Sequence, residues 1–99
     1  MTSIFKMGEN SMDVNVIVKI KSSYLAWFNI FNNDGENRAK ICDDSKTLCG
    51  QVDDKTAMIN FYDVDMEAMG AMMSSPEFAE LTDEHVVEHI VSALAPMPQ

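Results

Sequence analysis

The chain has 99 residues, 46% of them hydrophobic, which suits one domain with a single core. Its 7 Lys and Arg stand against 16 Asp and Glu, a formal net charge of −9, so it lacks the basic patch needed to bind nucleic acid or an anionic membrane surface. No stretch reaches the roughly 20 apolar residues that span a bilayer, and the first residues lack the apolar run of a secretory signal, so we expect a soluble cytoplasmic protein.

The first part of the chain contains a weakly patterned segment followed by a clear strand. Residues 1–12 show little periodicity and are predicted to form a flexible leader. Over residues 13–21, apolar side chains alternate with mostly polar ones, which is the pattern of a strand with one buried face. The residues predicted to face the core are Val14, Val16, Val18 and Ile20.

An aromatic helix is predicted next, with Ser22 or Ser23 as its N-cap and Asn33-Asp34-Gly35 as its end. Its aromatic residues recur at i, i+3, i+4 and i+7, so they form one stripe. The stripe consists of Tyr24, Trp27, Phe28 and Phe31. Residues 36–46 are polar, and the pattern leaves open whether residues 38–42 extend the helix or form a short loop.

Two strand-like runs, 47–52 and 57–62, flank the polar turn 53–55 and predict a β-hairpin. Gly50 interrupts the first run, which indicates a β-bulge or the close approach of another segment. Both runs are short enough to be strands of one sheet.

A methionine-rich helix follows, capped by Asp63 or Asp65. Its stripe consists of Met66, Met69, Met72 and Met73. Ser75-Pro76 predicts a further helical segment, because Ser is a good N-cap and Pro suits the first helical position; Phe78 and Leu81 are expected to point inward. Residues 86–94 alternate as a last strand, and 96–99 form a tail, so the predicted domain spans residues 13–95.

The order of these elements is βαββαβ, which predicts an α+β domain with the ferredoxin-like plan and an antiparallel sheet. Right-handed crossovers would place both helices on one sheet face and leave the other face bare. That face is predicted to be half apolar, with Ile17, Cys49, Met58, Tyr62 and either Val87 with Val91 or Val86 with Ile90. We therefore predict a homodimer formed sheet against sheet.

Residues 57–81 resemble a known family. Their strand is followed by the acidic helix start Asp65-Met-Glu-Ala68 and by the turn Ser75-Pro-Glu-Phe78, as in small dimeric α/β-barrel proteins. The aromatic helix with Ala26-Trp27 is similar as well, and the resemblance covers roughly residues 13–94. This superfamily includes antibiotic-biosynthesis-type monooxygenases and many small bacterial proteins. The resemblance implies a dimer with one ligand pocket in each protomer.

Such a pocket predicts a protein that binds or oxidises a small lipophilic or aromatic molecule without a cofactor. The predicted ligand-binding residues are Trp27, Phe28, Arg38 and Met69. His89 or Tyr62 would handle a proton, since imidazole titrates near neutrality. The alternative function is a non-catalytic, dimeric interaction or regulatory module.

Other motifs are interpreted as structural, and no metal site is predicted. The methionine stripe has the soft donors of a Cu(I) site but also the spacing of a core stripe, which we favour. His85 and His89, taken as residues of one strand, would stand about 13 Å apart, too far to share a metal. Cys42 and Cys49 are expected to be free thiols, and the paired acidic residues to be turns and caps.

Overall fold

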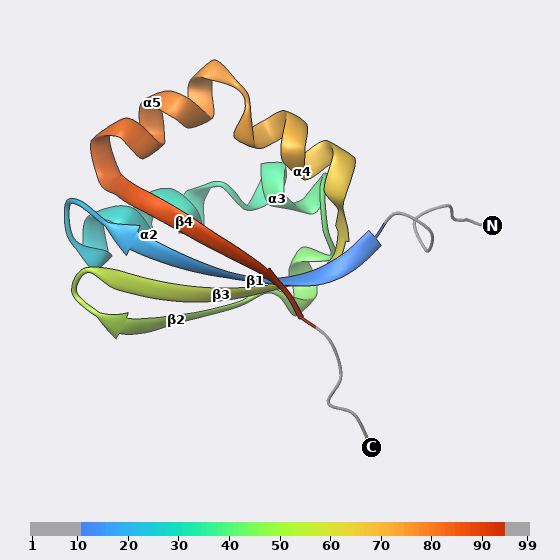
Figure 1. Ribbon diagram of the computed structural model, residues 1–99, viewed down its shortest axis with the longest axis horizontal. Helices are drawn as coiled ribbons and strands as arrows, with labels where there is room; N and C mark the ends of the chain where they lie inside the picture. Colours follow the sequence, from blue (N-terminus) through green and yellow to red (C-terminus); the bar gives the residue numbers. More distant parts are fainter. Residues whose placement is uncertain (1–10, 95–99) are drawn as a thin grey trace.

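Four strands form one open antiparallel sheet in the order β2-β3-β1-β4 in the computed structural model, which describes residues 11–94 (Figure 1). The strands are β1 (Ser11–Ile20), β2 (Leu48–Asp53), β3 (Thr56–Asp65) and β4 (Val86–Ala93). The helical segments are α2 (Tyr24–Asn33), α3 (Gly35–Ala39), the 3₁₀ turn η1 (Asp44–Lys46), α4 (Met66–Met73) and α5 (Pro76–His85). The predicted α+β class with an antiparallel sheet is confirmed, and the strand order is compatible with a ferredoxin-like fold.

The element boundaries differ from the prediction at two places in particular. β1 begins at Ser11, two residues inside the predicted leader; residues 1–10 of that leader and the predicted tail 96–99 lie outside the described residues. The polar stretch 36–46 contains α3 and η1, so residues 38–42 neither extend the first helix nor form only a loop.

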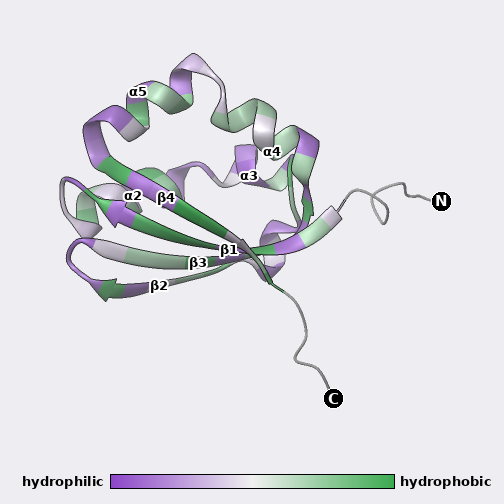
Figure 2. Cartoon of the chain, viewed as in Figure 1, coloured by the Kyte–Doolittle hydropathy of each residue, from purple (hydrophilic) through white to green (hydrophobic). Residues whose placement is uncertain are grey.

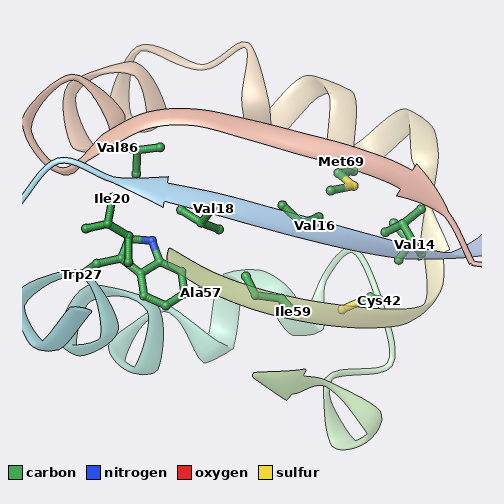
Figure 3. Packing of buried hydrophobic residues seen from close by; sticks show 11 residues of the cluster. Val14, Val16, Val18, Ile20, Trp27, Cys42, Ala57, Ile59, Met69 and Val86 are labelled. Carbon is green, nitrogen blue, oxygen red and sulfur yellow. The ribbon is translucent and has the colours of Figure 1, made fainter. Parts of the chain in front are cut away.

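The inward row of β1 forms the centre of the core, as its alternation predicts. Val14, Val16, Val18 and Ile20 are all at most 3% exposed. Trp27 from α2 packs toward the Ile20 end of this row and Met69 from α4 toward the Val14 end (Figure 3). Because β1 lies between β3 and β4, its inward side chains contact both neighbours and the helices above them.

Side-chain caps fix where the helices begin. Of the two predicted serines, Ser23 caps α2 by accepting a hydrogen bond from the Ala26 N–H (3.2 Å). Asp65 rather than Asp63 caps α4, since its carboxylate accepts from two backbone N–H groups. Ser75 caps α5, with Pro76 at its start as predicted.

The predicted irregularity at Gly50 is wrong. Gly50 pairs regularly with Met58, and the register shift lies between Gln51 and Asp53. No atom lies within 4 Å of the position where a Gly50 side chain would begin, so nothing approaches closely there either. The strand-end turn, rather than the glycine, therefore causes the irregularity.

A second bulge decides which residues of β4 face the helices. Glu88 pairs with Lys19 but Val86 pairs with Ile20, so Val87 is an extra residue in the strand. Val86 is consequently in the core while Val87 is 65% exposed. His89, opposite the inward-facing Val18, returns to the helix side.

The sheet face without helices is half apolar, but its composition differs from the prediction. Ile17 lies opposite Met58 on one side and Ile90 on the other, so these three residues form a row across the face. The prediction that Cys49 lies on this face is wrong, because Cys49 packs against the core instead. Neither predicted set from the last strand is right, since the bulge puts Val86 inward and Val87 outward.

The distribution of hydrophobic residues agrees with a core that lies between the sheet and the helices. Strongly hydrophobic residues run along β1 and β4, whereas much of α5 is hydrophilic (Figure 2). Within residues 11–94, none of the helices has the length and apolar character needed to cross a membrane.

Shortening one buried valine tests the central role of β1. Val18→Ala should lower the free energy of unfolding by about 2 kcal/mol, because it removes buried methyl groups and leaves a void. Val52→Ala is the matched control: Val52 is 58% exposed, and the change should cost less than about 0.5 kcal/mol. Equal losses for the two variants in urea unfolding would contradict this assignment of the core.

Candidate functional site

A cavity of about 120 Å³ lies between the sheet and the helices. Its wall takes residues from β1, β3 and β4 and from all four α-helices. Most of these residues are apolar or aromatic. The polar or titratable ones are Asp34, Arg38, Cys42, Thr82, His85 and His89. A small, mostly apolar hollow with a few polar groups is the usual form of a small-molecule site.

Helix segmentation explains why this hollow exists. α2 and α3 cover one part of the sheet, while α4 and α5 run along the β4 side (Figure 1). None of these helices exceeds 10 residues, so each covers only part of the core. The side chains of Phe31 and Ile41 line one side of the space between the two pairs, and those of Met72 and Phe78 line the other.

The structure brings four of the six predicted site residues together. Trp27, Arg38, Met69 and His89 line the cavity, although they come from four different elements. Their separation in sequence is large, so the sequence pattern alone could not establish that they share a wall.

The other two predicted residues do not line the cavity. Phe28 lies on the outer part of the aromatic stripe, where its ring stacks on Tyr24 (centroids 5.6 Å apart). Tyr62 follows Phe61 on β3, and strand alternation directs it to the opposite sheet face from Phe61, which lines the cavity. Tyr62 and His89 are therefore not presented to one ligand in this cavity.

Arg38 is a structural residue here. Its Nε donates to Asp44 Oδ1 (2.8 Å), and its Nη1 donates to the Phe31 carbonyl. The guanidinium also stacks over the Phe31 ring, 4.0 Å from the centroid. These contacts join α2, α3 and η1 and leave the Arg38 charge compensated by a carboxylate, so Arg38 is poorly suited to capture an anion.

His89 is the polar group best placed to meet a ligand. Its ring stacks on Phe78 (centroids 5.5 Å apart), and no side-chain hydrogen bond to it is found among residues 11–94. Burial lowers the pKa of His89 below its ordinary value of 6.5. The imidazole is therefore neutral at pH 7 and offers one N–H donor and one lone pair.

His85 also lines the cavity, which the sequence interpretation missed. It was assigned with His89 to one strand, but it is the last residue of α5. Its Nδ1 lies 2.9 Å from the Ser22 hydroxyl oxygen, which holds the ring at the start of β4. The Ser75-Pro76 helix start was the available signal, because a typical helix of about three turns from that point reaches residue 85.

The two cysteines are free thiols, as expected. Cys42 lines the cavity and donates to the Arg38 carbonyl (3.3 Å). Burial raises the pKa of both Cys42 and Cys49, so neither is a ready thiolate nucleophile. Within the described part of the chain, no three His, Cys, Asp or Glu residues gather as a metal-binding group.

Comparison with known proteins finds no family model, no curated protein and no solved structure that matches this chain. Any statement about its function therefore depends on the cavity, the open sheet face and their chemistry.

The half-buried His89 makes stability depend on pH. Because the folded protein holds this imidazole neutral to a lower pH than the unfolded chain does, the unfolded chain binds more protons between the two pKa values. The contribution of His89 to the free energy of unfolding should thus be constant above about pH 6.5 and fall as the pH drops below it.

Urea unfolding at pH 7.5 and 5.5 measures this effect, and His89→Gln should lose less stability between the two pH values than the original protein. An NMR titration of the His89 ring gives its pKa directly. A value at or above 6.5 would show that burial does not control this residue.

Proposed function

We propose that the protein binds a small lipophilic or aromatic molecule, about one ring in size, in the cavity between the helices and the sheet. The observation that carries this proposal is the mostly apolar cavity of about 120 Å³, whose wall includes the half-buried imidazole of His89. An apolar protein cavity of about 150 Å³ is known to accept benzene, so the volume suits one ring rather than a fused ring system.

The expected affinity is modest. Burying a benzene-sized surface contributes about 2 to 3 kcal/mol, and a single hydrogen bond to His89 adds about 1 kcal/mol. A fragment of this size would then bind with a Kd of about 1 mM, which corresponds to about 4 kcal/mol. His89 would form a hydrogen bond with a polar substituent on the ring of the ligand and would be the group that exchanges a proton with it.

Oxidation of the bound molecule stays a prediction from the resemblance to monooxygenase-like proteins. Of the two predicted proton-handling residues, His89 lines the cavity and Tyr62 does not. A reaction in this cavity would therefore depend on His89 alone among them.

A second candidate function, a dimeric interaction module, is favoured by the open sheet face. Met58 is 42% exposed and Ile90 39% exposed in the row that they form with Ile17. An exposed half-apolar face of this kind is typical of an interface, and a second copy of the same face would cover it by sheet-on-sheet packing. In this reading each protomer of a two-fold dimer contributes the same row of residues.

Filling the cavity should abolish ligand binding. Thr82 lines the inner wall on α5, so Thr82→Phe would place a ring where the ligand ring would sit. Binding of 2-phenylethanol can be followed through the fluorescence of Trp27, the only tryptophan in the chain and a cavity residue.

Asp83→Phe is the matched control, because it adds the same side chain at the exposed neighbouring position. We expect 2-phenylethanol to bind the original protein and Asp83→Phe alike, and to lose measurable binding to Thr82→Phe. Unchanged binding to Thr82→Phe would show that the ligand sits elsewhere.

Sedimentation at micromolar concentration tests the dimer. The original protein should sediment as a dimer and Met58→Lys as a monomer, because a charge on the apolar row opposes its burial against a partner. Leu25→Lys, at a 70% exposed position on α2, should leave the dimer intact. A monomeric original protein would rule out the module.

A further inference from the structure

A second hollow of about 440 Å³ lies between α3 and the α4–α5 segment and shares part of its wall with the cavity. The residues common to both walls are Asp34, Ile41, Met72, Phe78 and Leu81. These five shared residues lie at the boundary between the apolar inner cavity and the outer hollow, and we call this boundary the neck. Since Asn37, Lys40 and Glu77 line the outer hollow and are exposed, that end opens to solvent.

Because the inner cavity is mostly apolar and the outer hollow is more polar, a ligand that fills both would bind in one orientation. A ligand that fills both parts would keep its apolar end in the inner cavity and carry its polar end through the neck. Because Asp34 lines both hollows, a short alkyl arm would join the two ends of such a ligand. The occupant of the complete site is therefore an amphiphile rather than a plain hydrocarbon.

The negative charge at the neck favours a cationic group at the polar end of the ligand. Asp34 is the one charged residue that both hollows share. Its carboxylate accepts a hydrogen bond from Asn37 Nδ2 (2.6 Å), and no cation within the described residues forms an ion pair with it. Its charge is thus available to a ligand.

The other charged residues near the neck agree with this selection. Arg38, the cation of the inner wall, is already paired with Asp44 (2.8 Å). Lys40 lines only the outer hollow, where Glu77 also lies. The chain as a whole carries a net charge of −9, so its field attracts cations and repels anions.

We propose that the ligand is an arylalkylamine, with its ring in the inner cavity and its ammonium group at Asp34 in the neck. This inference rests on the proposed binding function and adds the class of ligand. The ammonium replaces part of its hydration by a charge-assisted hydrogen bond to the carboxylate, while the ring is buried among apolar side chains. A carboxylate on the same arm would face Asp34 and be repelled.

Three probes with the same ring and nearly the same length test the inference: 2-phenylethylamine, 2-phenylethanol and phenylacetate. Their dissociation constants would be measured at pH 7 and low salt by titration into ¹⁵N-labelled protein, with chemical-shift changes locating each probe. We expect the amine to bind about fivefold more tightly than the alcohol, and the carboxylate to bind most weakly.

Charge-neutralising variants distinguish the effect of the Asp34 charge from the effect of the net charge of the protein. Asp34→Asn keeps an oxygen that can accept from Asn37 but removes the charge, so it should bring the amine and the alcohol to equal affinity. Glu88→Gln is the matched control: it removes one negative charge from an exposed position on β4 that pairs with Lys19 and lines neither hollow. It should preserve the preference for the amine.

The outcomes distinguish the two proposals. Binding of the alcohol without a preference for the amine, or a preference that survives Asp34→Asn, overturns the inference and leaves the binding function standing. A preference lost equally in Glu88→Gln also overturns it, because the net charge would then be the cause. If none of the three probes binds, the binding function fails and the inference fails with it.

Discussion

The one-sided burial of β1 is the constraint on which the rest of this molecule depends. Its β-branched row packs against β3 and β4 within the sheet and against the helices above it. Since the helices within residues 11–94 cover the same face, the residues of β1 that point the other way are not covered by a helix from this part of the chain. The core, the cavity and the exposed apolar row are therefore consequences of a single asymmetric strand.

The helical layer covers this core incompletely, and most of the residues around the gap are apolar. Arg38 connects α2, α3 and η1 through its contacts with Asp44 and Phe31. Asp65 caps α4 and Ser75 caps α5, which fixes where these helices begin. These local contacts fix the two helix pairs without closing the space between them. A mostly apolar gap between helices and sheet is the usual form of a small-molecule site.

The sequence was informative wherever a local pattern decided the outcome. Alternation along β1 predicted its buried face, and Ser75 was identified as a helix cap by the proline that follows it. The first cap was narrowed to Ser22 or Ser23, and the structure shows that it is Ser23. It failed at bulges, because one extra residue reverses the alternation and leaves no mark on the local pattern. Val86 and Val87 are the example: each of the two predicted faces of the last strand was half right.

By itself, the sequence determined the α+β class, the order of the elements and most of the core, since all three follow from the spacing of apolar residues. Only the tertiary structure decided which polar groups meet. Asp34 lies in the turn between α2 and α3, and His89 lies more than fifty residues later on β4. Their placement on one cavity wall depends on helix packing and on the bulge in β4. The same packing excluded Tyr62 and Phe28, because a side chain's residue type does not determine the face from which it emerges.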